Sequence, residues 1–200
     1  MSDFNSNFHR RKSMRSNGYD YSNDGFYFIT ICVQNRDCLL GKIDLNKMIL
    51  NDAGQMTIRW YAELENKYPE IHCHEMVVMP NHFHCIIQID GIDRDFAYFD
   101  NKPLYGPDNK KYHSTIGDIF DWFKTMTTNE YIRGVKNLGW KRFDGHLWQR
   151  NYWDDIISSD DSLERIAEYI LRNPEKWEED QLNPERQNDG DWTDFRIASY

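Results

Sequence analysis

The order of strand-like and helix-like segments is the feature that most constrains the fold of this chain. The strand-like segments are rich in β-branched and aromatic residues, whereas the helix-like segments place apolar residues every three or four positions. In chain order they are a strand at 26–33, a helix at about 45–68, strands at 71–79 and 82–89, a helix at about 115–132 and a strand within 147–157. This β-α-β-β-α-β order predicts an α+β, ferredoxin-like domain with one antiparallel sheet and two helices on one of its faces.

An additional helix is predicted after the last strand. Ser159 can cap its start, its apolar stripe includes Ile166 and Ile170, and Pro174 ends it. Because the first two helices cover one face of the sheet, the other face is free to hold a site, and this last helix can lie across it. The polar segment 91–114 is predicted to be a loop.

The composition predicts one folded domain over residues 1–200. Forty per cent of the 200 residues are hydrophobic and 15% are aromatic, which suits a globular chain with a sizeable core. The sequence contains no apolar run long enough to span a bilayer and no apolar segment typical of a signal peptide, so we expect a cytoplasmic protein without membrane contact. Its four cysteines lack the C-x-x-C spacing and are interpreted as thiols, mostly buried.

Charge is distributed unevenly along the chain. The formal net charge is −9, yet residues 1–24 form a basic arm and residues 175–200 form an acidic tail. Nucleic-acid contacts depend on local basic patches rather than on net charge. The candidate DNA-binding residues are Arg10, Arg11, Lys12 and Arg15 in the arm, and Lys124, Arg133, Lys136, Lys141 and Arg142. Taken alone, each cluster also fits an ordinary solvated surface.

Two histidines one residue apart lie within the strand-like segment 82–89. Side chains at positions i and i+2 of a strand point to the same face, so His82 and His84 present two imidazoles side by side. Such a pair provides half of a divalent metal site. The alternative is a pair of histidines on a solvated sheet face.

The last helix contains a tyrosine that can act with these histidines. Tyr169 and Asn173 are four residues apart and therefore share one helical face. A tyrosine near a helix end is usually a packing residue, but a phenol can attack phosphorus when a divalent cation withdraws charge from the phosphate. The oxygen of Asn173 could complete the shell of that cation. Tyr131 has no asparagine four residues on, and Tyr152 is expected to be structural.

A second group of metal-binding residue types lies close by, at His72-Cys73-His74. With Pro80-Asn81 as a two-residue hairpin loop, continuing the register would place His74 opposite Ile87 and His72 opposite Ile89. Both would then lie on the other face from His82 and His84 and several residues away, so we do not expect a shared zinc site. A three-residue loop would reverse the face but not the distance.

Taken together, several segments resemble the REP-associated tyrosine transposases, within the single-tyrosine HUH (His-hydrophobic-His) superfamily. The resemblance begins at residues 15–22 and continues through the strand at 27–35. It then includes residues 79–84 (Met-Pro-Asn-His-Phe-His), 148–152 (Trp-Gln-Arg-Asn-Tyr) and 169–174 (Tyr-Ile-Leu-Arg-Asn-Pro). It does not extend clearly into the acidic tail after Trp177.

The resemblance implies a ferredoxin-like fold, a Mg²⁺ or Mn²⁺ site at His82 and His84, and Tyr169 as the nucleophile, with Asn173 as a further metal ligand. The implied reaction is cleavage and rejoining of single-stranded or hairpin DNA through a 5′-phosphotyrosine, in DNA transposition. Two alternatives remain: a non-catalytic DNA-hairpin-binding protein of the same fold, and a metal-dependent phosphohydrolase that uses activated water. The sequence leaves homodimerisation open.

Overall fold

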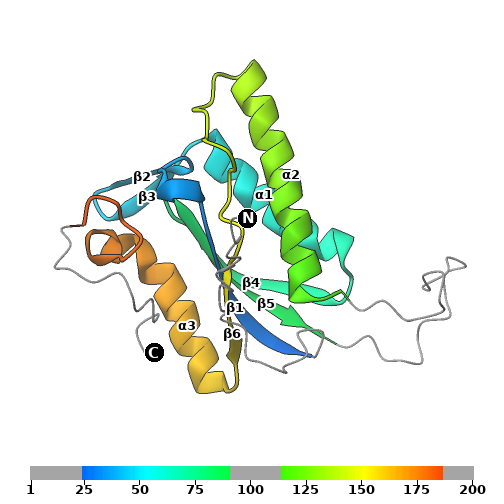
Figure 1. Ribbon diagram of the computed structural model, residues 1–200. Coiled ribbons are helices and arrows are strands. Elements are labelled where there is room, and N and C mark those ends of the chain that lie inside the picture. The colour runs from blue at the N-terminus through cyan, green and yellow to red at the C-terminus, as the bar shows by residue number, and fades with distance from the viewer. Residues whose placement is uncertain (1–23, 91–113, 187–200) are drawn as a thin grey trace, which may run out of the picture.

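The centre of the protein is a four-stranded antiparallel sheet (Figure 1). The computed structural model describes residues 24–90 and 114–186. The strands are β1 (Gly25–Cys32), β4 (Ile71–Val78), β5 (His82–Ile89) and β6 (Trp153–Ile157), and they lie in the order β4-β5-β1-β6. The two central strands, β1 and β5, therefore pair with a neighbour on both sides.

Within the described part of the chain, three α-helices pack on this sheet, two on one face and one on the other (Figure 1). Helices α1 (Asp52–Lys67) and α2 (Ile116–Asn137) cover the face that contains the larger core, and α3 (Asp160–Arg172) covers the opposite face. Short 3₁₀ helices, η1 (Gln34–Arg36) and η2 (Asn173–Glu179), follow β1 and α3. The predicted α+β class is confirmed, and the main elements follow one another in the expected β-α-β-β-α-β order with an additional last helix.

The alternation of side chains along β5 separates these two faces. Phe83, Cys85 and Ile87 belong to the larger core against α1 and α2. His82, His84 and Ile86 point the other way, and Ile86 packs with Phe28 and the α3 residues Ile166 and Ile170. The last helix thus lies across the face that holds the two histidines, as the sequence predicts.

Side-chain caps fix the start of each of the helices α1, α2 and α3. Thr115 and Asp118 form a reciprocal capping box at α2, with the Thr115 side chain accepting from the Asp118 backbone and the Asp118 side chain accepting from Thr115. Ser159 caps α3 as expected, and Asn51 caps α1. Helix α2 continues to Asn137, past the end predicted near Ile132.

The predicted helix from about Leu45 to Tyr68 is wrong in its first part. Residues 41–50 form a two-stranded hairpin, β2 (Gly41–Asp44) and β3 (Lys47–Leu50), and α1 begins only at Asp52. The hairpin turn uses Leu45 and Asn46, both with positive φ (48° and 60°), as a tight two-residue turn requires. Because leucine seldom adopts this conformation, the sequence gives little indication of a turn there.

The register of the β4–β5 hairpin is predicted correctly near its turn and wrongly further away. Val77 pairs with His84, and the Met79 amide donates to the His82 carbonyl, as expected for a two-residue loop. A bulge between Cys73 and Met76 then shifts the register by one residue, so that His72 pairs with Gln88 instead of Ile89. A one-residue shift exchanges the two faces of a strand, which sequence periodicity alone did not reveal.

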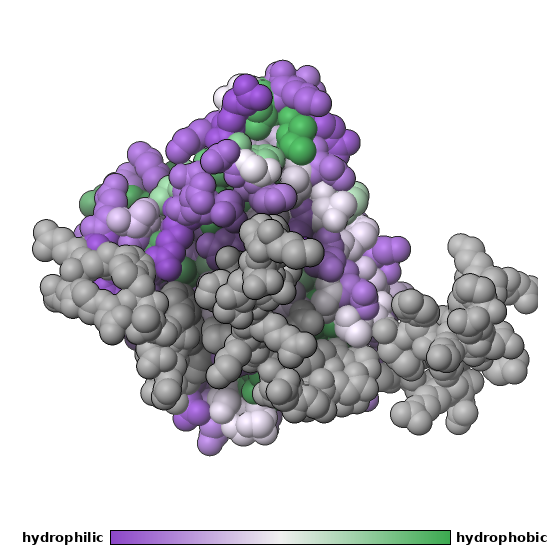
Figure 2. Space-filling view, in the orientation of Figure 1, coloured by the Kyte–Doolittle hydropathy of each residue, from purple (hydrophilic) through white to green (hydrophobic). Residues whose placement is uncertain are grey.

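Several predicted features fall outside the described residues: the basic arm apart from Asp24, nearly all of the expected loop at 91–114, and the acidic tail from residue 187 onward. Among the described residues, no helix is long and apolar enough to cross a membrane. Hydrophilic residues cover most of the described surface visible in Figure 2. The four cysteines are free thiols; Cys32 and Cys85 are buried, Cys73 is half-buried and Cys38 is exposed.

Candidate active site

His82 and His84 lie together on the α3 face of the sheet, as their spacing predicts, but they are buried rather than solvated. Their ring centroids are 4.6 Å apart, and the residues are 0% and 2% exposed. The Phe28 ring stacks against His84, and the Trp177 ring stacks against His82. The alternative of two histidines on a solvated sheet face is therefore wrong.

The hydrogen bonds of Asn81 determine the protonation state of His82. Asn81 Nδ2 donates to the carbonyls of Arg36 (3.0 Å) and Leu182 (2.7 Å), so its oxygen must face His82 Nδ1 at 2.8 Å. That nitrogen must be the protonated one, and the proton-free Nε2 of the neutral ring carries a lone pair. The hydroxyl of Thr30, 2.7 Å from His84 Nδ1, can accept a hydrogen bond from a protonated Nδ1 in the same way.

The second nitrogen of each ring has no hydrogen-bond partner. His82 Nε2 and His84 Nε2 are both buried and unpaired. Burial lowers the pKa of His84 to about 3, and burial, together with the charge of His84, lowers the pKa of His82 well below its usual value. Both imidazoles are therefore neutral at physiological pH. Neutral rings with one nitrogen held by a partner and the other unpaired are the form in which histidines bind metal ions.

Tyr169 projects from α3 onto the histidines. Its ring centroid is 5.5 Å from that of His84 and 6.1 Å from that of Phe28. Burial and the negative charge of Asp180 raise the pKa of Tyr169 to about 12, although a hydrogen bond with Asn173 acts in the opposite direction. The phenol is therefore protonated at neutral pH.

Asn173 lies at the end of α3 and interacts with both the tyrosine and His82. It is 3% exposed, and its side chain influences the pKa of both Tyr169 and His82. Its Oδ1 nevertheless has no partner at hydrogen-bonding geometry. Three buried, unpaired atoms, Nε2 of His82, Nε2 of His84 and Oδ1 of Asn173, are thus located in one site.

These atoms fit a divalent cation, because imidazole nitrogens and an amide oxygen are suitable ligands for one. Within residues 24–90 and 114–186, no three His, Cys, Asp or Glu side chains form a metal-binding group by themselves. A cation held by the two histidines would therefore take its other ligands from groups such as an amide oxygen, water or a phosphate.

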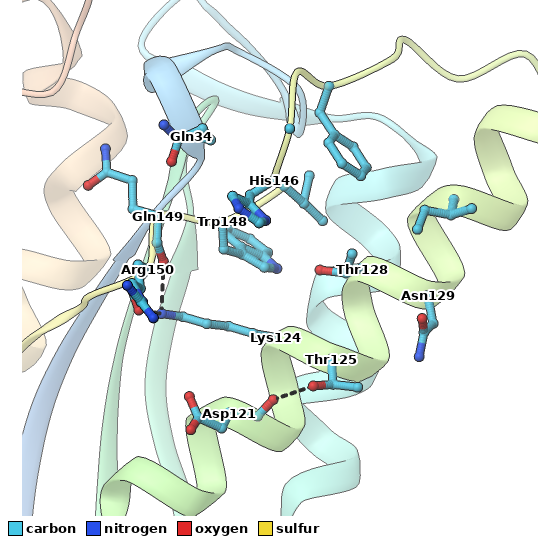
Figure 3. Close-up of a pocket in the computed structure, with 14 residues that line it drawn as sticks. Gln34, Asp121, Lys124, Thr125, Thr128, Asn129, His146, Trp148, Gln149 and Arg150 are labelled. Carbon is cyan, nitrogen blue, oxygen red and sulfur yellow. Dashed lines mark hydrogen bonds between the residues drawn. The ribbon is translucent and has the colours of Figure 1, made fainter.

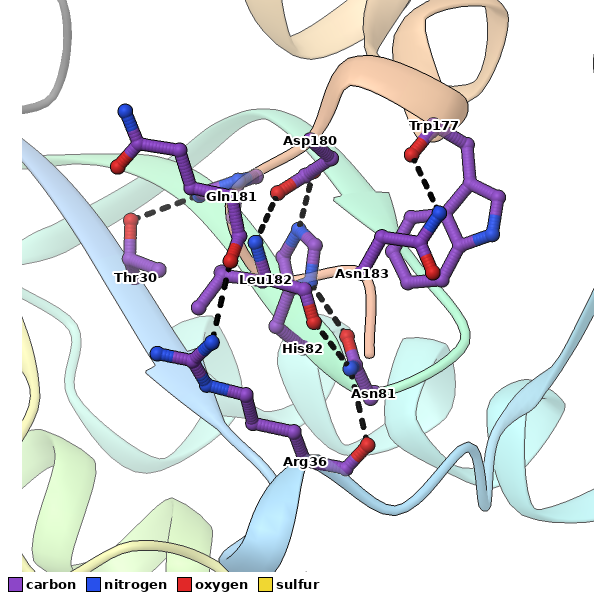
Figure 4. Close-up of polar contacts among 10 residues, drawn as sticks. Thr30, Arg36, Asn81, His82, Trp177, Asp180, Gln181, Leu182 and Asn183 are labelled. Carbon is purple, nitrogen blue, oxygen red and sulfur yellow. Dashed lines mark hydrogen bonds and ion pairs between the residues drawn. The ribbon is translucent and has the colours of Figure 1, made fainter. Parts of the chain in front are cut away.

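The chain after α3 returns over His82 (Figure 4). Asp180 Oδ2 lies 3.6 Å from His82 Nε2, and the Asn81 side chain holds the Leu182 carbonyl. Neither Asp180, Asn81 nor Thr30 was predicted as a site residue. Thr30 could have been suspected because it shares a face with Phe28 in β1, whereas the sequence contains no indication that Asp180 returns to this site.

The two competing tyrosines lie on the other side of the sheet. The Tyr131 hydroxyl donates to the Lys141 carbonyl at 2.8 Å, and its ring packs on Trp140 and Phe143. Tyr152 packs against Phe120 in the larger core. Both tyrosines are therefore separated from the histidines by the sheet.

His72 and His74 lie away from the histidine pair, although not on the predicted face. The bulge in β4 places His72 opposite Gln88, and His74 Nε2 is 3.0 Å from Gln88 Oε1. Gln88 is on the same face as His84 but four residues beyond it, which is about 13 Å along a strand. The expected face was wrong, while the separation along the strand is as predicted.

The basic residues predicted at positions 124–142 differ in their exposure. Arg133, Lys136, Lys141 and Arg142 are exposed. Lys124 is half-buried instead, and its ammonium donates to the carbonyls of Gln149 (3.1 Å) and Arg150 (3.3 Å) (Figure 3). Lys124 thus holds the segment before β6 against α2, and its predicted contact with DNA stays a prediction.

An open pocket of about 880 Å³ lies beside Lys124, between α2 and residues 143–150. The neighbouring Trp148 is buried, and its indole donates to Thr127 Oγ1 at 2.8 Å. The backbone N–H of Gln149 donates a hydrogen bond to the Cys32 carbonyl at the end of β1. The segment from Trp148 to Tyr152 thus joins β1 to α2 and lies outside the histidine site.

No family model matches the chain. A Haemophilus influenzae protein described only as an uncharacterized protein is 37% identical over 90% of this chain and 96% of its own length. A second protein of that organism, named "Putative REP-associated tyrosine transposase", is 25% identical over 78% of this chain and 74% of its own. Among solved structures, a REP-associated tyrosine transposase bound to a REP hairpin superposes with a TM-score of 0.52 at 20% identity, covering 82% of this chain and 74% of that one.

Proposed function

We propose that the protein is a metal-dependent, single-tyrosine transposase of the HUH type. The chain belongs to one family with the uncharacterized Haemophilus influenzae protein. It also has the fold of a REP-associated tyrosine transposase. It would cleave and rejoin single-stranded or hairpin DNA in DNA transposition. We also propose that the protein acts in the cytoplasm, where it would meet its DNA substrate.

One observation supports this proposal above all others: Tyr169 lies against His84, one of two adjacent buried histidines whose Nε2 atoms have no hydrogen-bond partner. Unpaired buried polar atoms cost stability, so their presence together beside a phenol favours a functional role. The three residues come from β5 and α3, which are held rigidly by the smaller core of Phe28, Ile86 and Ile166.

In the proposed reaction the Tyr169 oxygen attacks a DNA phosphorus atom. The phenol loses its proton, the bond between the tyrosine oxygen and phosphorus forms, and the bond from phosphorus to the 3′ oxygen breaks. The 3′ oxygen takes up a proton and leaves as a hydroxyl, while the 5′ phosphate stays attached to Tyr169. A second 3′ hydroxyl can reverse these steps, because the phosphotyrosine conserves the bond energy.

His82, His84 and Asn173 would hold the Mg²⁺ or Mn²⁺ ion. When bound, the cation withdraws charge from the phosphate and favours loss of the nearby phenolic proton. Asn81 and Thr30 would orient the two imidazoles through their Nδ1 atoms, and Tyr169, whose ring is 5.5 Å from that of His84, would supply the attacking oxygen. With a pKa of about 12, Tyr169 would not ionise at neutral pH without such help.

The DNA would be bound through basic side chains. Arg133, Lys136, Lys141 and Arg142 are exposed in the structure, and Arg10, Arg11, Lys12 and Arg15 lie outside the described residues. We propose phosphate contacts for both groups. Basic side chains that contact phosphates make affinity dependent on salt.

The direct test is a covalent adduct. A hairpin library with single-stranded flanks is labelled at the 3′ ends and incubated with full-length protein and Mn²⁺. A 5′-phosphotyrosine would retain the labelled fragment on the protein in a denaturing gel. The adduct should be absent with EDTA and absent in Tyr169→Phe, which removes only the oxygen, and it should persist in the control variant Tyr152→Phe.

The same assay separates the alternatives. A DNA-hairpin-binding protein without chemistry would shift the hairpin in a native gel but would form no adduct. A phosphohydrolase using activated water would release cleaved fragments without retaining label on the protein. Either result would overturn the proposed nucleophile.

A further inference from the structure

Asp180 is the one carboxylate that directly faces the histidine pair among the described residues. Its Oδ2 is 3.6 Å from His82 Nε2, and its side chain is only 11% exposed. Its charge also contributes to raising the pKa of Tyr169. Asp180 belongs to the chain beyond η2, in the acidic tail for which the sequence suggested no role.

Residues 180–183 are fastened over His82 by several contacts (Figure 4). Asn81 Nδ2 donates to the Leu182 carbonyl, and Arg36 Nη1 donates to the Gln181 carbonyl at 3.1 Å. Asn183 Nδ2 donates to the Trp177 carbonyl at 3.0 Å. Leu182 is 3% exposed and Asn183 is 7% exposed. We call residues 180–183 the C-terminal strap.

The strap determines which carboxylate oxygen faces the histidine. Asp180 Oδ1 accepts from the Leu182 amide at 2.6 Å, and this bond leaves Oδ2 directed at His82. Asn81 forces the proton of His82 onto Nδ1, so a lone pair of Nε2 faces an oxygen of Asp180. Two electron-rich atoms in a buried site repel each other unless a proton or a cation lies between them, and burial raises the pKa of the Asp180 carboxyl. Bound beside both atoms, a divalent cation would remove this repulsion.

The separation of these atoms suits a shared cation. Two ligands about 2.1 Å from one ion are about 3.0 Å apart at a right angle and about 3.4 Å apart at a tetrahedral angle. The observed 3.6 Å is slightly longer, and Asp180 does not complete a metal-binding group with the two histidines as they stand. A small closure of the strap or one intervening water would connect the carboxylate to the ion.

We propose that Asp180 supplies the negative charge that holds the divalent cation against His82 and His84, directly or through one water of the ion, and that the strap keeps it there. This inference rests on the function proposed above. Two neutral imidazoles and an amide bring no charge to balance the ion, and Mg²⁺ and Mn²⁺ prefer carboxylate oxygens. The site would then be completed by a segment beyond the tyrosine helix.

The test measures Mn²⁺ binding to full-length protein by titration calorimetry in the absence of DNA. Asp180→Asn, which keeps the size but removes the charge, should weaken Mn²⁺ binding at least tenfold. Glu179→Gln removes a charge from the neighbouring exposed residue and should change affinity less than twofold. Asn183→Ala loosens the strap while retaining the carboxylate and should give an intermediate loss. The double variant His82→Ala/His84→Ala should abolish binding, which places the titrated ion at this site.

Equal Mn²⁺ affinity of Asp180→Asn and wild type would overturn the inference. A variant with unchanged Mn²⁺ affinity and a raised yield of DNA adduct would also overturn it, because Asp180 would then act as an obstacle to the phosphate. Thermal melts show whether each variant is folded. Asp180-dependent Mn²⁺ binding without any DNA adduct would contradict the proposed function alone, and a wild type that binds no Mn²⁺ would contradict both.

Discussion

Strand β5 has two faces of opposite character, although both are buried. Phe83, Cys85 and Ile87 point into a core of apolar side chains under α1 and α2. His82 and His84, which alternate with them, point toward α3 and are equally buried, yet each has an unpaired ring nitrogen. The same strand therefore buries apolar side chains on one face and polar atoms without hydrogen-bond partners on the other.

The difference shows where the molecule gives up stability. Apolar side chains gain free energy when buried, whereas an unpaired polar atom loses it unless a ligand or ion occupies the site. The α3 face is also the smaller core, formed by residues such as Phe28, Ile86, Ile166 and Ile170. We therefore expect substitutions on the face toward α1 and α2 to lower mainly stability. Substitutions of the histidines on the α3 face should affect mainly the formation of the DNA adduct.

The largest difference, both in stability and in adduct formation, is expected between the variants Phe83→Ala and His84→Gln. Phe83 is 0% exposed and packs against Tyr61 and Phe123, so its truncation should cost about 3–5 kcal/mol in the free energy of unfolding. Where the variant remains folded, it should still form the DNA adduct. His84→Gln should cost less stability and abolish the adduct. Urea denaturation and the adduct assay measure both effects, and equal losses of stability would contradict the contrast between the faces.

The α3 face should also make the metal-free protein sensitive to acid. The pKa of His84 is about 3 in the folded state and about 6.5 in the unfolded state. Below pH 6.5 the unfolded chain therefore binds a proton that the folded chain excludes, and folding stability falls as pH decreases toward 3. His84 alone should remove about 3 kcal/mol by pH 4.

Denaturation of the metal-free protein between pH 7 and pH 4 would check this prediction. His84→Gln should lose part of the pH dependence, and bound Mn²⁺ should shift the loss of stability to lower pH, because protons and the ion compete for the same nitrogen. An unchanged pH profile in His84→Gln would indicate that other groups cause the acid sensitivity.

A smaller loss of stability is expected on the core face, where two buried side chains form a hydrogen bond with each other. Thr127→Val removes the hydroxyl that accepts from the buried Trp148 indole at 2.8 Å and should cost about 1–2 kcal/mol. Thr125→Val provides the matched control, because its hydroxyl bonds the Asp121 carbonyl on the exposed side of α2 and should change stability by less than about 0.5 kcal/mol. Equal costs in urea denaturation would show that the Trp148 contact contributes nothing of its own.

The smallest effect is expected at the exposed basic residues. Replacing Arg133, Lys136, Lys141 and Arg142 by alanine should weaken hairpin binding about threefold in 50 mM salt and flatten the salt dependence by less than about one counterion. Lys42→Ala/Lys47→Ala, on the β2–β3 hairpin, serves as a control for loss of charge. Binding isotherms at several salt concentrations measure both slopes, and unchanged slopes would exclude this group as phosphate contacts.

Much of the fold followed from periodicity. The bounds of β5 and the caps at Thr115 and Ser159 agree with the sequence, because alternation and capping are local properties. The β2–β3 hairpin was missed, since Leu45 and Asn46 do not form one of the usual turn sequences. The bulge in β4 was missed because the insertion of one residue depends on tertiary packing.

The site was predictable only in part for a related reason. His82, His84, Tyr169 and Asn173 could be named because their spacing within single elements placed each pair on one face. Asp180 approaches the site only because the chain turns back after η2, and its position depends on long-range contacts such as that of Asn81 with Leu182. Lys124 was assigned to a surface from charge alone, although packing directs it to backbone carbonyls.

The central claim is that the α3 face performs phosphotyrosine chemistry with Tyr169. Mass spectrometry of the proteolysed DNA adduct, formed with full-length protein and Mn²⁺, tests it most directly. We predict a nucleotide attached through its 5′ phosphate to the peptide containing Tyr169, and no adduct in Tyr169→Phe. An adduct on Tyr131 or Tyr152, or one that persists in Tyr169→Phe, would contradict the account.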